Sequence, residues 1–154
     1  MSAVVGDFVI ERSRSRTGKH ALVSQLLLFS RGTGLSRLPE SRILSREAAR
    51  PTYSRGTSER VRVVARPDDA LLYVWLVRNF RGKVKGYITV FSGRGEPIYR
   101  ARYDDGRLAR SFGEPAHAWL VRLAAQALGL AVRETRLGDE GGARGPRRQG
   151  PQGA

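Results

Sequence analysis

The stretch from residue 60 to residue 112, RVRVVARPDDALLYVWLVRNFRGKVKGYITVFSGRGEPIYRARYDDGRLARSF, decides the fold of this chain. Short runs rich in Val, Leu, Ile, Tyr and Phe alternate in it with turn signals that contain Gly, Pro or Asp, which is the pattern of an antiparallel meander. The alternation predicts strands over residues 60–66, 70–79, 87–92 and 97–103, with residues 108–112 extending the sheet. Residues 70–79 are apolar at almost every position, which predicts a central strand covered on both faces.

A helix is expected directly after the meander. Pro115 suits the first turn of a helix, and Gly129 suits its C-cap. Between them, apolar side chains recur on one stripe at Ala116, Leu120, Leu123, Ala124, Ala127 and Leu128. A last strand is expected over residues 130–137. We therefore predict an α+β fold, in which a twisted antiparallel sheet (a meander of four or five strands) carries one main helix over residues 114–128 on one face. Its other face is left free for a ligand or a partner.

The N-terminal part is less regular. Residues 1–12 alternate as a strand does, and residues 20–30 form a short apolar run that periodicity alone does not distinguish from a buried helix. We favour a strand, which gives an N-terminal hairpin. Residues 31–57 read as a long basic loop with one short helix over residues 39–50, begun by Pro39 and stopped by Pro51.

Domain boundaries follow from the composition of the C-terminal end. Residues 138–154 consist mostly of Gly, Pro, Gln and Arg, which is typical of disorder. The expected organisation is therefore one α+β domain over residues 1–137 and a disordered tail over residues 138–154.

Charge gives the strongest indication of function. The chain has 28 Lys and Arg against 14 Asp and Glu, a net charge of +14 on 154 residues, and residues 11–66 alone hold 13 cations and four acids. Such a surface attracts polyanions, of which nucleic acid is the commonest in a cell. All but Lys19, Lys83 and Lys85 of the cations are Arg, the better bidentate ligand for phosphate. An Arg-rich composition can also reflect coding bias.

Several classes of protein are disfavoured by composition. The absence of Cys excludes disulfides, thiolate metal sites and a Cys nucleophile. No apolar run reaches the length of a membrane span, and the N-terminus lacks the pattern of a secretory signal, so we expect a cytoplasmic protein without a membrane role. A single Met, no Cys and abundant Arg are also compatible with a thermophilic source.

The meander supplies the candidate binding residues, because it mixes aromatic and basic side chains. Rings stack on bases and cations follow phosphates in proteins that bind single strands. Alternation places Tyr87 and Phe91 on the same face of their strand. In the next strand, it places Tyr99 on one face and Arg100 and Arg102 on the other. The alternative is that these rings are core residues. The candidate nucleic-acid contacts are Arg78, Arg81, Lys83, Lys85, Tyr87, Phe91, Arg94, Tyr99, Arg100 and Arg102. Tyr73 and Trp75 would add a stacking surface if their face of the sheet is exposed.

Catalytic patterns are weak throughout. Residues 13–19 resemble a phosphate loop only superficially, because the first Gly is missing and His20 stands where a hydroxyl residue is required. The pairs Asp68-Asp69 and Asp104-Asp105 lie where turns favour Asp. His20 and His117 lack clustered carboxylates. We expect no catalytic residue, no metal site and no cofactor.

The sequence therefore predicts a non-enzymatic protein that binds nucleic acid, single-stranded DNA or RNA before duplex. One alternative is a structural or interaction subunit of a nucleoprotein or RNA-processing complex, with a protein partner or a homo-oligomer. A metal-dependent nuclease using Asp104, Asp105 and His117 is less favoured. The sequence does not decide whether the ligand is DNA or RNA, or whether particular base sequences are preferred.

Overall fold

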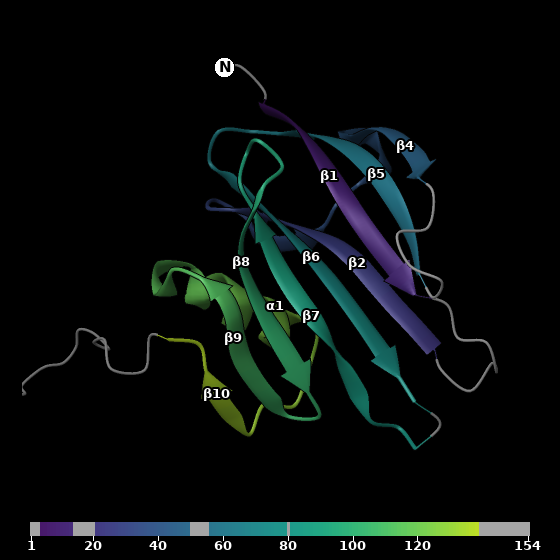
Figure 1. Cartoon of the computed structure of the whole chain (residues 1–154). Coiled ribbons are helices and arrows are strands. Elements are labelled where there is room, and N and C mark those ends of the chain that lie inside the picture. Colours follow the sequence, from purple (N-terminus) through teal and green to yellow (C-terminus); the bar gives the residue numbers. More distant parts are fainter. Residues whose placement is uncertain (1–3, 14–20, 50–55, 80, 139–154) are drawn as a thin grey trace, which may run out of the picture.

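A seven-stranded sheet forms the centre of the molecule. The computed structural model describes residues 4–13, 21–49, 56–79 and 81–138 (Figure 1). The strand order is β10-β9-β8-β7-β6-β2-β3, and all neighbours are antiparallel except β10 and β9. The strands are β2 (Ala21–Ser30), β3 (Gly34–Arg37), β6 (Asp69–Arg78), β7 (Val84–Phe91), β8 (Pro97–Asp104), β9 (Arg107–Gly113) and β10 (Glu134–Arg136).

A second sheet of three strands covers part of the first. It has the antiparallel order β1-β5-β4, with β1 (Val4–Ser13), β4 (Ile43–Ala49) and β5 (Gly56–Ala65). The helical elements are two short 3-10 helices, η1 (Glu40–Arg42) and η2 (Pro115–His117), and the α-helix α1 (Ala118–Ala127). Of the helices in the described part of the chain, none has the length and apolar character to cross a membrane.

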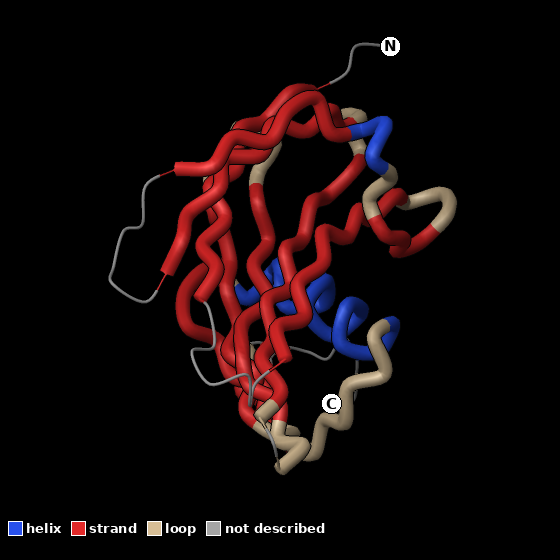
Figure 2. Tube along the Cα trace, turned by 90° about the vertical axis from the view of Figure 1, so that its right-hand side faces the viewer, coloured by secondary structure: helices blue, strands red, loops and turns tan. Residues whose placement is uncertain are grey.

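The two covers lie on opposite faces of the seven-stranded sheet, so the fold has three layers (Figure 2). On one face, Leu72, Val74 and Leu76 of β6 join the core that includes Leu120 and Val121 of α1. On the other face, the seven-stranded sheet packs against the three-stranded sheet. Its side chains in this contact are Leu26 and Leu28 of β2, Leu71 and Tyr73 of β6, and Phe91 of β7. The three-stranded sheet contributes Phe8 and Ile10 of β1 and Val61 and Val63 of β5. The predicted double burial of the central strand is confirmed. The expectation that the face opposite the helix is free is wrong where the three-stranded sheet packs on it.

The α+β class is also confirmed, but the size of the sheet is not. The expected meander of four or five strands is wrong, because residues 60–65 belong to β5 of the other sheet, and because β2, β3 and β10 extend the consecutive strands β6 to β9 to seven. The expected strand over residues 130–137 is only three residues long and runs parallel to β9. The helix expected over residues 114–128 begins with η2 and continues as α1.

The N-terminal predictions need larger corrections. Residues 1–12 and 20–30 do not pair as a hairpin, because β1 pairs with β5 and β2 pairs with β6 and β3. The helix expected over residues 39–50 is wrong as well: Pro39 precedes only one 3-10 turn, and the chain then pairs with β5 as β4. Residues 31–57 are therefore not one long loop. The expected tail over residues 138–154 lies outside the described residues except for Gly138.

The tip of the β7–β8 hairpin joins the two sheets. Gly95 at this tip has φ +84°, and a Cβ there would overlap the backbone carbonyl of Asp7 in β1. Only glycine permits both that backbone conformation and that close approach. Nearby, Phe8 and Phe91 meet edge to face, with ring centroids 5.1 Å apart.

Two tyrosines of β8 hold the segment that follows α1. The hydroxyl of Tyr99 donates to the carbonyl of Leu137 at 2.7 Å, and that of Tyr103 donates to the carbonyl of Ala131 at 2.6 Å. Tyr99 and Leu137 are fully buried. Burial raises the pKa of the Tyr103 phenol above its ordinary value of 10.

Tyr99→Phe should lower the free energy of unfolding by about 1–3 kcal/mol, because it leaves the buried Leu137 carbonyl without this donor. Tyr87→Phe is the matched control, since the Tyr87 hydroxyl makes no hydrogen bond with the described residues; its effect should stay within about 0.5 kcal/mol. Urea denaturation of the two variants measures the difference. Equal effects would contradict the assigned role of the Tyr99 hydroxyl.

Tyr103 should make the protein less stable in alkaline solution. Its pKa is raised in the folded state, so the stability it contributes is complete below the unfolded pKa of about 10 and is lost as the pH rises through the folded value. The melting temperature of the wild type should therefore fall more steeply above this pH than that of Tyr103→Phe. Parallel curves would show that Tyr103 ionises equally in the two states.

Candidate nucleic-acid interface

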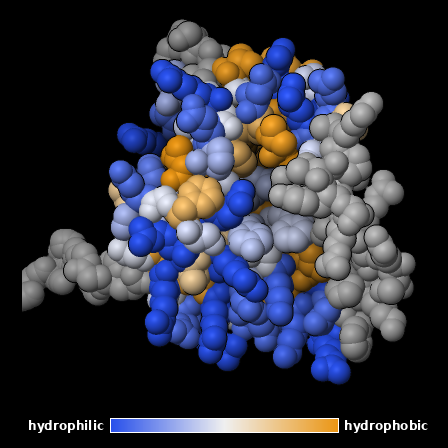
Figure 3. All heavy atoms as spheres, in the orientation of Figure 1, coloured by the Kyte–Doolittle hydropathy of each residue, from blue (hydrophilic) through white to orange (hydrophobic). Residues whose placement is uncertain are grey.

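One part of the seven-stranded sheet is covered by neither α1 nor the three-stranded sheet. It lies on β7, β8 and β9 and at the end of β6, on the face opposite α1. We define the open face by the side chains Trp75, Lys85, Tyr87, Arg100, Arg102 and Phe112, all exposed or partly exposed. Trp75 lies at its border, because it also packs against the core beneath the three-stranded sheet. Figure 3 views the molecule from the side of this face and shows pale and light-orange side chains among strongly hydrophilic ones.

Aromatic rings and one guanidinium form a continuous row across the open face. Trp75 and Tyr87, paired across β6 and β7, stack with centroids 6.2 Å apart and planes 19° from parallel. The guanidinium of Arg100 lies 5.6 Å from the Tyr87 centroid and 5.3 Å from the Phe112 centroid. The order across the strands is therefore Trp75, Tyr87, Arg100 and Phe112.

A hydrogen bond holds Arg100 in this row. Its Nε donates to Oγ1 of Thr89 at 3.0 Å, and Thr89 is itself buried. A guanidinium has five N–H donors, so this bond leaves four for other acceptors. Because the group is fixed between two rings, it loses little conformational freedom when it binds an anion or stacks on a base.

A glycine in β7 brings the strands close together beside the row. Gly86 lies opposite Leu76, and a Cβ at Gly86 would overlap the backbone carbonyl of Trp75. Any other residue would push β7 away from β6 at this point. Gly86 therefore helps to set the separation of the Trp75 and Tyr87 rings.

Phe112 is a residue that the sequence analysis did not single out. Simple alternation from the buried Leu108 would place Phe112 on the helix-facing side of β9. The pairing of β8 and β9 shifts by one residue at this point, because Arg100 pairs with Phe112 while the adjacent Ala101 pairs with Arg110. This irregularity turns Phe112 onto the open face, where it is 39% exposed.

Basic side chains flank the row at the end nearest the β6–β7 turn. Lys85 and Arg102 are exposed and lie on the two strands that also carry Tyr87 and Arg100. Asp104 reduces this charge in part, since its carboxylate lies 3.8 Å from Arg102. Both partners are about half exposed, so the ion pair is weak and leaves Arg102 able to bind a phosphate.

Two of the expected stacking rings are buried. Tyr99 belongs to the core beneath α1, and Phe91 is 6% exposed and packs against Phe8 of the three-stranded sheet. A base cannot reach either ring, so both are removed from the candidate contacts. The rings that remain on the open face are Trp75, Tyr87 and Phe112. Tyr73 is also buried.

The remaining cations do not all gather at the open face. Arg81 and Lys83 lie in the β6–β7 turn beside Lys85, where the side-chain oxygen of Asn79 accepts from both of their backbone N–H groups at 2.9 Å. Arg94 lies at the other end of β7, about 25 Å away by the length of the strand. Arg78 lies on the helix-facing side of the sheet, and we remove it from this interface.

The carboxylate pairs have structural surroundings. Asp69 accepts hydrogen bonds from the Arg42 guanidinium at 2.5 Å and from the backbone N–H of Arg66 at 2.7 Å. Asp105 occupies a turn with φ +45°, next to Asp104. In the described residues, no three His, Asp or Glu side chains form a group that could hold a metal ion. His20 and most of residues 13–19 lie outside the described residues.

Comparisons with protein-family models, with curated proteins and with solved structures give no match to this chain.

Proposed function

We propose that the protein binds single-stranded nucleic acid on the open face and carries out no catalysis. The observation that carries this proposal is the row of Trp75, Tyr87, Arg100 and Phe112, in which a guanidinium lies between rings on an accessible sheet surface. A net charge of +14 supplies the long-range attraction to a polyanion.

The form of the surface favours a single strand over a duplex. Rings that lie on a sheet can stack on bases only when those bases are free of their own neighbours, as in single strands and loops. A duplex would present phosphates to the cations but no base to Tyr87 or Phe112. The open face thus gains its aromatic contribution only from unpaired bases.

Different side chains of the open face contact different parts of the nucleic acid. Tyr87 and Phe112 offer surfaces on which bases stack, and Arg100 between them can stack on a base or bond a phosphate. Lys85 and Arg102, with Arg81 and Lys83 in the adjacent turn, neutralise phosphates further along the strand. Neither kind of contact depends strongly on base identity, so we expect weak sequence preference.

Binding of short labelled DNA and RNA single strands should weaken steeply as salt is added. If phosphate contacts dominate, log affinity falls linearly with log salt, with a slope of about −0.7 for each phosphate neutralised on a single strand. Fluorescence anisotropy over a range of salt concentrations measures this slope. A response independent of salt would remove the electrostatic basis of the proposal, and a duplex that binds more tightly than either strand would contradict the stacking part.

Cation and ring substitutions should produce two different signatures. The double variant Lys85→Gln/Arg102→Gln should weaken binding to all sequences and make the salt slope shallower by about one to two contacts. Tyr87→Leu and Phe112→Leu should each cost about 1–3 kcal/mol of binding free energy with little change in slope, because they remove stacking and not counterion release.

The double variant Arg37→Gln/Arg122→Gln provides the charge control, because both residues are exposed and lie on β3 and α1, away from the open face. It lowers the net charge by the same amount. If it weakens binding as much as Lys85→Gln/Arg102→Gln does, attraction is general and the open face is not the site. Circular dichroism and melting temperature establish that each variant is folded.

A further inference from the structure

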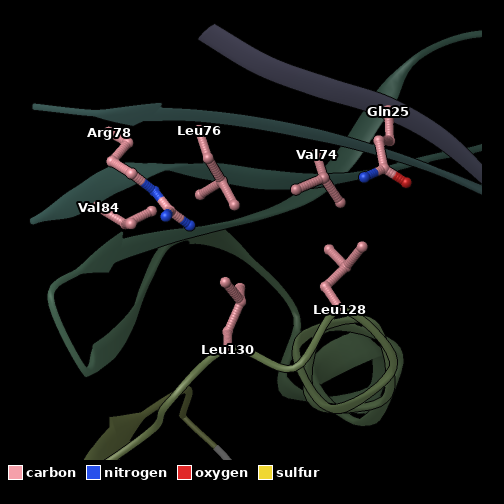
Figure 4. Close-up of a pocket in the computed structure, with 7 residues that line it drawn as sticks. All are labelled: Gln25, Val74, Leu76, Arg78, Val84, Leu128 and Leu130. Atoms are coloured by element: carbon pink, nitrogen blue, oxygen red, sulfur yellow. The ribbon is translucent and has the colours of Figure 1, made fainter. Parts of the chain in front are cut away.

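A cavity of about 110 Å³ lies on the face of β6 and β7 opposite the open face. It lies between the seven-stranded sheet and the segment in which α1 ends, and it is partly open to solvent (Figure 4). Its walls are aliphatic: Val74 and Leu76 of β6, Val84 of β7, and Leu128 and Leu130 at and after the end of the helix. A space of this size is several times what one water molecule requires.

The two ends of the cavity are polar. Arg78 lies at one end and Gln25 at the other, and Figure 4 shows the Arg78 guanidinium turned toward the gap between the sheet and Leu130. Neither side chain makes a hydrogen bond or an ion pair with any residue that the structure describes. A guanidinium that has no partner among the described residues and lies at the mouth of an aliphatic cavity is a recognition element for an anion attached to an apolar group.

We propose that this cavity binds a small amphipathic carboxylate, with its apolar chain along the aliphatic walls and its carboxylate on Arg78. This site goes beyond the proposed nucleic-acid interface, because it uses the other face of the same strands. A phosphate backbone has no apolar chain to place against Val74, Leu76 and Leu128. The two activities can therefore be tested separately.

The orientation of the ligand follows from charge. Leu128 caps the C-terminal end of α1, where the helix carries partial negative charge that disfavours an anion. Arg78 is the last residue of β6, so the carboxylate belongs there and the chain of the ligand extends toward Gln25. Val74 and Arg78 are four residues apart on one face of β6, which gives the cavity a length of about 13 Å.

This length sets the size of the ligand. An extended chain of roughly eight carbons is shorter than the 13 Å estimate from strand geometry, and a much longer chain would meet the polar amide of Gln25. Residues 139–154 contain no large apolar side chain, so that end of the protein itself offers no equivalent group. We therefore expect a medium-chain carboxylate from outside the chain.

The test compares three probes with the same chain and different head groups: octanoate, octan-1-ol and octylamine, each below its critical micelle concentration. Isothermal titration calorimetry with the full chain should give the order octanoate, then octanol, then octylamine. Loss of the charge-assisted bond should weaken octanol about tenfold or more relative to octanoate. Acetate, which keeps the head group without the chain, should bind far more weakly than octanoate.

Substitutions locate the site. Arg78→Met nearly keeps the length of the side chain and removes its charge. The variant should bind octanol as the wild type does, and its affinity for octanoate should fall to about its affinity for octanol. Lys83→Met makes the same change in charge in the nearby turn and should leave octanoate affinity unchanged. Arg78→Lys should retain part of the preference for octanoate. Leu130→Phe, which fills the cavity, should weaken octanoate and octanol alike.

Several results would overturn the proposal. Failure of wild-type protein to bind octanoate would do so, as would equal binding of the three head groups. Equal losses in Arg78→Met and Lys83→Met would indicate general attraction of anions to a basic protein. Unchanged octanoate binding in a folded Leu130→Phe variant would place the ligand elsewhere. None of these results bears on nucleic-acid binding at the open face, which is measured with oligonucleotides.

Discussion

The double burial of β6 is the constraint on which the rest of the structure depends. Leu72, Val74 and Leu76 require an apolar cover on one face, and Leu71 and Tyr73 require one on the other. The chain supplies α1 for the first and the three-stranded sheet for the second. Both covers end before the sheet does. The open face is the region where the second cover stops, and the aliphatic cavity lies where the first one stops.

Local patterns predict the strands well, and they fail where a partner distant in the sequence decides the structure. Alternation locates β6 to β9 because each strand pairs with the next one along the chain. β1 pairs with β5 across more than forty intervening residues, and nothing near residue 10 indicates that partner. Residues 43–49 have an apolar spacing compatible with a helix, but pairing with β5 makes them a strand.

The candidate site is harder to predict than the sheet. Tyr87 and Tyr99 lie on neighbouring strands, and both strands alternate in the same way. The sequence around each tyrosine does not indicate whether its face of the sheet is covered by another layer. The structure places one on the open face and the other in the core. Phe112 depends on an irregular pairing between β8 and β9, for which the sequence gives no clear signal. Residue types therefore predict that the surface is aromatic and basic, whereas the packing of the three layers decides which of these side chains are exposed.

The bonds from Tyr99 and Tyr103 to the segment after α1 have a consequence for the synthesis of the protein. Their acceptors are the carbonyls of Leu137 and Ala131, which are synthesised after β8 itself. Until then, two phenols of a central strand lack these partners and the helix-facing core stays incomplete. β1 likewise has no strand to pair with until β5 has been synthesised. Some apolar strands of the nascent chain are thus made before the segments that cover them, which favours chaperone contact and late acquisition of the native state.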